Sequence, residues 1–374
     1  MSSSRAGEVS VVATSGSWIE GEALAQLEGT ARLDGVVRAV GLPDLHPGRG
    51  APIGAAIFAD GVVYPHLVGS DIGCGMALFG TGLSQRAAKR DRWARKLTGL
   101  ERPWDGDASD VVAAHGLDPE EHVDALGTIG GGNHFAELLR VERVVDSAAL
   151  AAVGLEPDEL ALLVHSGSRG LGDAILRRHT SAHGASPLLA ASAEGRAYLE
   201  AHDRAVRFAV ANRALIAARF AAQIAGVPRA LLDVCHNSVT RRDGLLLHRK
   251  GAAPHDRGPV VVPGSRGDFS YLVAPVGDGA TGGFSLAHGA GRRWTRSDAR
   301  ERVRAAQRRE QLEQTRLGSR VICEDRDLLY EEAPAAYKDV ERVVADLEAH
   351  GLCRTVATLR PVLTYKTRVE RDDD

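Results

Sequence analysis

Short apolar runs separated by glycine-rich segments dominate the hydrophobic pattern of the chain. Residues 55–68 predict a strand, a tight turn at Asp60-Gly61 and a second strand. Four more apolar runs predict buried strands, at residues 159–165, 231–237, 258–265 and 359–366. Two of these runs end at or beside a histidine, His165 and His236, so the strand ends are the first places to look for chemistry.

Helical patterns alternate with these strands. The region 17–41 combines a short helical pattern with an apolar strand that ends at Gly41. Residues 41–54 hold several prolines and glycines and predict a loop, while residues 105–126 predict loop and helix. Four longer helices are predicted, at residues 84–100, 191–226, 298–317 and 334–349.

Nothing in the pattern divides the chain into parts. There is no internal repeat, no low-complexity linker and no clean break in composition. We therefore expect one domain over residues 1–374, with frayed ends at residues 1–15 and 368–374.

The composition restricts the class of protein. With 44% hydrophobic residues, the chain can bury a sizeable core. A formal net charge of −3 and a pI near 6.5 exclude the global basic field that many nucleic-acid-binding proteins carry, but leave room for a local basic channel. Dispersed arginines such as Arg169, Arg249, Arg266 and Arg293 are candidates for contacts with a nucleic acid, although each is more often an ordinary surface residue.

Cysteine usage and the absence of apolar segments indicate the compartment. The four cysteines lie far apart without a CxxC pair, which predicts reduced thiols rather than a disulfide framework or a zinc ribbon. The N-terminus lacks the apolar run of a signal peptide, and no stretch of about 18 apolar residues predicts a membrane span. These features favour a cytoplasmic protein with no membrane partner.

One glycine-rich loop places a carboxylate, Asp71, and a thiol, Cys74, three residues apart. His134, His165 and His236 are further candidate ligands. Each histidine alone is more often a satisfied core or surface residue, but histidines at strand ends and in glycine loops, together with an aspartate and a cysteine, favour a metal site. Five such ligands exceed the needs of one tetrahedral ion and indicate two metals, an arrangement typical of phosphoryl chemistry.

Other polar residues also stand in glycine-rich surroundings. The loop at residues 127–137 has three consecutive glycines, which let backbone approach a ligand closely, and it carries Asn133 and Glu137. His288 lies next to another glycine loop. Asp44 and His46 fit a polar turn about as well as a site.

Several mechanisms are excluded by what the sequence lacks. No Gly-Lys-Ser/Thr occurs, so there is no P-loop, and no Lys-x-Asp-Gly occurs, so the usual lysine nucleophile of nucleotidyl transferases is missing. Gly277–Gly282 matches GxGxxG but has no clear strand–helix context, so we interpret it as a flexible loop.

A series of motifs stands in order along the chain: Pro-Asp-Leu-His-Pro-Gly, Gly-Ser-Asp-Ile-Gly-Cys-Gly-Met, Gly-Gly-Gly-Asn-His-Phe-x-Glu, His-Ser-Gly-Ser-Arg-Gly, Cys-His-Asn, His-Arg-Lys-Gly-Ala, Pro-Gly-Ser and His-Gly-Ala-Gly-Arg. This series resembles the RtcB family of GTP-dependent RNA ligases from about residue 40 to Lys366. In its short length and in the sequence around Asp44, the chain resembles the branch of the family that is associated with the peptide-chain release factor H. The resemblance implies an α+β fold, a single domain with mixed β-sheets surrounded by helices and a central metal-lined cleft.

The resemblance also implies roles for particular residues. Two manganese ions would be held by Asp71, Cys74, His134, His165 and His236, with Cys74 bridging them. His288 matches the histidine that becomes attached to GMP. The guanine nucleotide would be contacted by Asn133, Glu137, Ser265, Ser270, Gly289, Ala290, Gly291, Arg292 and Lys366. Two departures from the family pattern, Arg266 and Thr367, bear on nucleotide preference and turnover.

The implied activity joins an RNA 3′-phosphate or 2′,3′-cyclic phosphate end to a 5′-hydroxyl end, with GTP as co-substrate, in RNA repair or tRNA maturation. It would proceed through a covalent histidine–GMP and a guanylylated RNA 3′ end, since a neutral imidazole can attack the α-phosphorus of GTP. An archease-type activator or a release-factor-like protein is a further candidate partner. Two alternatives are a binuclear metal-dependent phosphoesterase acting on RNA ends and a non-catalytic RNA-repair accessory. The set His288, Arg292 and Lys366 argues against both.

Overall fold

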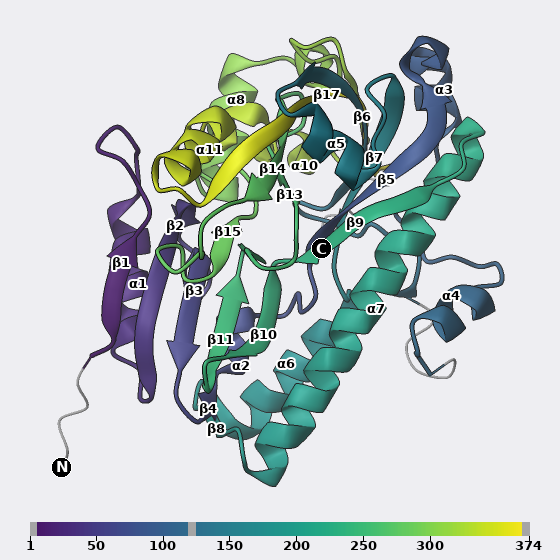
Figure 1. Cartoon of the computed structure of the whole chain (residues 1–374). Helices are drawn as coiled ribbons and strands as arrows, with labels where there is room; N and C mark the ends of the chain where they lie inside the picture. Colours follow the sequence, from purple (N-terminus) through teal and green to yellow (C-terminus); the bar gives the residue numbers. More distant parts are fainter. Residues whose placement is uncertain (1–5, 119–124, 369–374) are drawn as a thin grey trace, which may run out of the picture.

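The computed structural model describes residues 6–118 and 125–368 (Figure 1). The expectations for the extreme ends, residues 1–5 and 369–374, and for residues 119–124 within the predicted loop and helix, lie outside the described residues. The fold is a single mixed α+β domain in which curled sheets are surrounded by helices, as the sequence predicts.

The larger sheet has strands that contain or lead to most of the candidate metal ligands. Within the described residues it has eight strands, with the order β13-β14-β17-β6-β7-β5-β9 and with β16 pairing in parallel with β17. Its strands are β5 (Gly75–Ser84), β6 (Phe135–Val144), β7 (Glu159–Ser166), β9 (Arg229–Cys235), β13 (Val260–Pro263), β14 (Ser270–Pro275), β16 (Arg320–Cys323) and β17 (Cys353–Thr367). The apolar runs of β5, β6 and β7 are buried on both faces, which explains their continuous hydrophobic character.

A second sheet, of five strands in the described part of the chain, lies beside the first and has the order β1-β2-β3-β11-β10. Its strands are β1 (Glu8–Val11), β2 (Val36–His46), β3 (Ile53–Ala59), β10 (Asn237–Arg242) and β11 (Leu245–Lys250). Two small ribbons pair β12 (Ala252–Pro254) with β15 (Ser285–Ala287) and β4 (Val62–Val63) with β8 (Leu188–Leu189). β12 follows directly from β11, so the chain leaves the second sheet close to the strand that leads to His288.

Helices cover the sheets from outside (Figure 1). They are α1 (Gly21–Ala31), α2 (Pro65–Val68), α3 (Arg90–Lys96), α4 (Ser109–Ala114), α5 (Ser147–Val153), α6 (Gly170–His183), α7 (Ala193–Ile224), α8 (Arg296–Ala306), α9 (Arg309–Glu313), α10 (Arg326–Glu331) and α11 (Val340–Ala349). The long helix α7 packs across β5 and β7, where Ile216 and Phe220 share a core cluster with Leu162 and Ala77. Ser192 caps its N-terminus by accepting a hydrogen bond from the Gly195 amide.

Several predicted boundaries are confirmed and several are wrong. The buried strand at residues 159–165 and the helix at 191–226 are present as β7 and α7. The loop predicted for residues 41–54 is wrong at its start, because β2 continues to His46 with Leu42 and Leu45 fully buried. Helix α6, which begins at Gly170 soon after His165, was not predicted. Strand β6 was not predicted.

Three predicted helices are shorter or divided. β5 extends to Ser84 and a 3₁₀ turn follows, so the helix predicted for 84–100 is only α3. The helix predicted for 298–317 is interrupted at Gln307, and α9 restarts where the Gln311 side chain accepts a hydrogen bond from the Arg308 amide. A 3₁₀ turn precedes α11, which begins only after Asp339.

The expectation of a frayed N-terminal end up to residue 15 is wrong for Glu8–Val11. This segment forms β1, which pairs in parallel with β2 from Arg38 to Gly41. Backbone pairing holds the segment although its own side chains are only partly buried. Among the described residues, no helix is both long enough and apolar enough to cross a membrane, and all four cysteines are free thiols, as predicted.

Candidate functional site

Four neighbouring strands bring four of the candidate ligands to one edge of the larger sheet. β7 and β9 both run antiparallel to β5, so each ends beside the start of β5. Cys74 immediately precedes β5, His165 is the penultimate residue of β7, and His236 immediately follows β9. β6 starts beside the end of β7, and His134 immediately precedes it. The topology therefore gathers residues that are far apart in the sequence.

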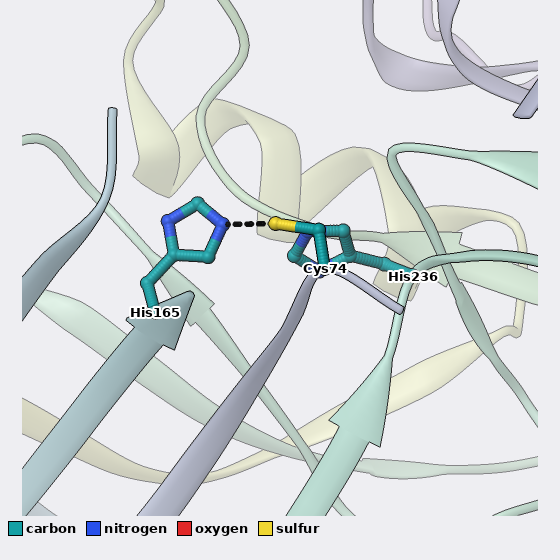
Figure 2. Close-up of side chains that lie close together, drawn as sticks. All are labelled: Cys74, His165 and His236. Atoms are coloured by element: carbon teal, nitrogen blue, oxygen red, sulfur yellow. Dashed lines mark hydrogen bonds between the residues drawn. The ribbon is translucent and has the colours of Figure 1, made fainter. Parts of the chain in front are cut away.

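The side chains of this edge are in mutual contact. The Cys74 Sγ atom lies 3.1 Å from His165 Nε2 and 3.3 Å from His134 Nε2. His134 Nε2 also lies 2.7 Å from the Asp71 carboxylate. His236 completes the set behind the sulfur atom, as Figure 2 shows, and its ring centroid is 5.2 Å from that of His165.

Two overlapping groups could each hold a metal ion: Cys74 with His165 and His236, and Asp71 with Cys74 and His134, with the ligand atoms of each group within 4.8 Å of one another. Carboxylate, thiol and imidazole donors together suit borderline divalent metals. Cys74 belongs to both groups, so it is the side chain that could contact two ions. The donor set and its burial fit metal binding.

Burial sets the protonation of the cluster in the absence of a metal. It lowers the pKa of His165 and of His236 well below the usual histidine value, with a further contribution from neighbouring imidazoles. Burial and the nearby Asp71 carboxylate raise the pKa of the Cys74 thiol. Burial opposes ionisation of Asp71, but the His134 ring outweighs it and lowers the pKa of that carboxyl.

Close backbone approach shapes the loop that carries Asp71. A Cβ atom on Gly167 would lie 2.0 Å from Asp71 Oδ1, so no side chain is tolerated there without moving the carboxylate. Gly73 has a φ of 77°, and a Cβ atom on it would lie 2.7 Å from the Cβ atom of Ala209 in α7. Glycine at both positions is therefore a requirement of the site geometry.

A pocket opens next to the cluster. His165 lines it, as do almost all residues that the sequence analysis assigned to nucleotide binding: Asn133, Glu137, Ser265, Gly289, Ala290, Gly291, Arg292 and Lys366. Ser270 does not line it, because this residue is buried at the start of β14 opposite Pro263. A second, more open hollow adjoins the cluster and is lined by Asp71, Asn133, His134, Arg169 and Arg296, among others.

His288 stands at the boundary between the pocket and the cluster. Its ring centroid is 4.8 Å from that of His236, and its side chain lines the pocket. Its Nδ1 atom lies 2.6 Å from the Asp44 carboxylate, which also accepts a hydrogen bond from the His288 backbone amide at 3.2 Å. A carboxylate can only accept, so Nδ1 carries the hydrogen, and Nε2 is the nitrogen that holds the lone pair in the neutral imidazole.

Asp44 and His46 belong to this site. The sequence had left open whether they belong to a site or to a polar turn. Asp44 is fully buried, and His46 lines the pocket with its ring 6.4 Å from that of His288. The pairing of β2 with β3 is irregular between Gly41 and His46, which frees this stretch to turn toward His288. A Cβ atom on Gly291 would lie 2.3 Å from the Asp44 carbonyl oxygen, so the glycine loop after His288 packs directly on it. The available clue in the sequence was that Asp44 stands between two leucines, Leu42 and Leu45, in an apolar stretch.

Buried titratable side chains also line the pocket. Burial raises the pKa of Glu137 to about 8, although Thr364 donates a 2.5 Å hydrogen bond to its carboxyl group. Burial lowers the pKa of Lys366 to about 8, and its Nζ atom lies 4.0 Å from Glu332. Arg292 donates to Glu332 at 3.0 Å, and the Tyr337 hydroxyl also donates to it. No sequence motif pointed to Glu332, Tyr337 or Thr364.

The raised pKa of Glu137 predicts a specific pH dependence of stability. The folded state retains a proton that the unfolded state loses above pH about 4.5, so this group favours folding less and less as the pH rises toward 8. Relative to Glu137→Gln, the unfolding free energy of the wild type should fall by up to about 1.4 kcal/mol per pH unit in this window. Denaturant unfolding of both proteins at pH 6, 7 and 8 measures the difference, and parallel profiles would contradict it.

Two of the arginines considered for RNA contact are not surface residues. Arg249 is buried and donates to Ser285 and Thr240 side chains. Arg266 is buried, lines the pocket and donates to the Leu329 carbonyl. Arg169 does reach the site, where its guanidinium donates to His134 Nδ1 at 3.2 Å.

The fold and the site together define a protein with a buried cysteine–histidine–aspartate cluster of metal-binding type, adjoining a pocket with charged ends and a carboxylate-held histidine. The sequence model of the family described as "tRNA-splicing ligase RtcB" matches residues 26–103 and 106–367 of the chain. The chain belongs to the RtcB family.

Curated relatives agree with this assignment. The chain is 47% identical over 368 residues to RNA-splicing ligase RtcB2 of Escherichia coli, a match that covers 96% of this chain and 95% of the relative. It is 32% identical over 429 residues to RNA-splicing ligase RtcB of Mycobacterium tuberculosis, covering 90% of this chain and 99% of the relative. An archaeal relative, tRNA-splicing ligase RtcB of Aeropyrum pernix, is 29% identical, with 91% of this chain and 90% of the relative covered.

Proposed function

We propose that this chain is an RNA ligase that joins 3′-phosphate or 2′,3′-cyclic phosphate ends to 5′-hydroxyl ends through a covalent His288–GMP. Family membership supports RNA ligation, and the names of the relatives place such ligases in RNA and tRNA splicing. The requirement for GTP, the choice of manganese and the chemistry of the RNA ends are not given by the names of the relatives and are part of this proposal.

The observation that carries the proposal is the position of His288. Its ring stands between the metal-binding cluster and the pocket, and Asp44 accepts a hydrogen bond from Nδ1. A carboxylate on the second ring nitrogen is also common among metal-binding histidines. What distinguishes His288 is that its side chain lines the pocket and that, among the described residues, it belongs to neither candidate metal-binding group. This arrangement is the one that a nitrogen nucleophile requires.

In the first step, Nε2 of His288 attacks the α-phosphorus of GTP, and the bond from that phosphorus to the pyrophosphate oxygen breaks. Asp44 holds the Nδ1 hydrogen and stabilises the positive charge that develops on the ring. Bound manganese ions, held by Asp71, Cys74, His134, His165 and His236, would offset the charge of the phosphates and of the leaving pyrophosphate.

In the second step, an oxygen of the RNA 3′-phosphate attacks the phosphorus of the histidine-bound GMP, the nitrogen–phosphorus bond breaks, and Nε2 regains its lone pair. In the third step, the 5′-hydroxyl oxygen attacks the RNA 3′-phosphorus and loses its proton to water, the phosphoanhydride P–O bond breaks, and GMP leaves with the bonding electron pair. A 2′,3′-cyclic phosphate end must first be opened by water to a 3′-phosphate.

Other pocket residues have roles that follow from their chemistry. Glu137 and Lys366 line the same pocket and offer a carboxyl group and an amine to the edge of a guanine base. Arg292 and the amides of residues 289–291 lie beside His288 and suit the phosphates. Arg169 and Arg296 line the adjoining hollow and provide positive charge for an RNA end. The dependence on an archease-type or release-factor-like partner stays a prediction.

Incubation of the purified protein with manganese and α-labelled GTP tests the proposal. We expect an acid-labile covalent label on the protein, which moves to an RNA carrying a 3′-phosphate and leaves as GMP when a 5′-hydroxyl end is added. Absence of label at every manganese concentration, with release of phosphate from cyclic-phosphate RNA ends, would replace the ligase by the phosphoesterase. Absence of both activities would favour the non-catalytic accessory.

A further inference from the structure

We infer that Arg213, together with its neighbour Asn212, positions the four chain segments that carry the candidate metal ligands and thereby sets the metal affinity of the site. Both residues lie in the middle of α7 and both are fully buried. Neither touches the cluster itself. The inference rests on the proposed metal-dependent function, because it requires that the cluster binds a metal.

Arg213 bridges two of the segments through backbone carbonyls. Its Nη1 atom donates to the carbonyl oxygen of Gly73 and to that of Ser166, at 2.8 Å each. Gly73 immediately precedes Cys74, and Ser166 immediately follows His165. One guanidinium nitrogen therefore links the residues next to the two ligand atoms that lie 3.1 Å apart.

The other side of the same guanidinium is fixed to the strand that leads to His236. Nε and Nη2 donate to the two carboxylate oxygens of Asp233 in β9, at 3.0 and 2.6 Å. This bidentate pair compensates a charge that would otherwise be buried alone. Burial would lower the pKa of Arg213, but Asp233 outweighs it and the pKa is raised, so the guanidinium stays charged.

Asn212 holds the fourth segment. Its side-chain oxygen accepts hydrogen bonds from the amides of Gly127 and Thr128, at the start of the glycine-rich loop that ends in His134. Its side-chain nitrogen lies within hydrogen-bond distance of the Thr128 carbonyl, the Ser166 hydroxyl and the Gly167 carbonyl, at 3.1, 3.1 and 3.2 Å. The dipeptide thus contacts the segments of Cys74, His134, His165 and His236.

These contacts matter because one buried dipeptide joins segments that lie far apart in the sequence and that each carry or adjoin a candidate ligand. Charge-assisted hydrogen bonds in a buried site are strong and geometrically restrictive. Substitution of a residue that orients metal ligands without contacting the metal typically lowers the metal affinity by about 10- to 100-fold. Lysine in place of Arg213 keeps the charge but cannot bond Asp233 with two nitrogens while reaching both carbonyls.

The test measures manganese binding to the full chain by electron paramagnetic resonance and calorimetry, without any activity assay. We expect Arg213→Lys to weaken manganese binding by about 10- to 100-fold and to alter the spectrum of the bound ion. Asp233→Asn, which leaves both carbonyl contacts in place, should fold and lose less affinity. Arg249→Lys is the matched control, since the Arg249 side chain is also buried but donates to Ser285, Thr240 and the Phe284 carbonyl, and not to the residues that Arg213 and Asn212 hold.

The outcomes separate this inference from the function on which it rests. If Arg249→Lys loses as much affinity as Arg213→Lys at equal loss of thermal stability, Arg213 has only a general structural role and the inference is overturned. Unchanged binding and spectrum in a folded Arg213→Lys protein would also overturn it. If the wild type binds no manganese, the metal-dependent function fails first, and this inference fails with it.

Discussion

Replacement of His288 by alanine is expected to abolish covalent attachment of GMP altogether. The nucleophilic nitrogen disappears, and no other described histidine both lines the pocket and donates to a buried carboxylate. His165 and His46 also line the pocket, but His165 faces the Cys74 sulfur and His46 Nδ1 lies 2.8 Å from the Asp44 carbonyl oxygen. The measurement is the label retained on denatured protein after incubation with α-labelled GTP and manganese.

Asp44→Asn extends the same test to the group that holds His288. An amide can present its NH₂ group to Nδ1 and select the wrong tautomer, so we expect guanylylation to slow by about 10²- to 10⁴-fold without complete loss. His115→Ala, at the end of the remote helix α4, is the control and should label like the wild type. Normal labelling of His288→Ala would show that another residue is the nucleophile.

Replacement of Cys74 by alanine is expected to remove the metal centre. Cys74 is the member that the two candidate ligand groups share, so one substitution affects both. A metal site that loses one thiolate ligand typically loses most of its affinity for the metal. We therefore expect the bound ions and the guanylylation to disappear together. Metal analysis of the purified protein after dialysis against manganese measures the first effect, and the label measures the second.

Cys353→Ala provides the matched control for this variant. Cys353 is likewise a buried free thiol, but it lies at the start of β17 in a hydrophobic core cluster. Both substitutions remove one sulfur from the interior, so both should lower stability to a similar degree. Retention of the full metal content by Cys74→Ala would contradict the assignment of the cluster.

The sequence alone determined the local features of this protein. Hydrophobic periodicity predicted β7 and α7 because each is a long, consistent pattern that local propensity and burial reinforce. The glycine loops around Cys74, His134 and His288 were recognisable by composition, and they contain positions that require glycine through a positive φ, such as Gly73, Gly132 and Gly291. Motif order was sufficient for the family, and the fold and family assignments are confirmed.

The tertiary structure decided which residues meet. His288 and Asp44 are 244 positions apart, and Arg213 reaches Gly73 over 140 positions and Ser166 over 47, so no local pattern could connect them. From the sequence, Asp44 fitted a polar turn about as well as a site, since prolines and glycines surround it. Arg213 looked like one more polar residue in a long helix. Contacts of this kind arise from strand order and helix packing, which fix distant segments against one another only once the whole core has formed.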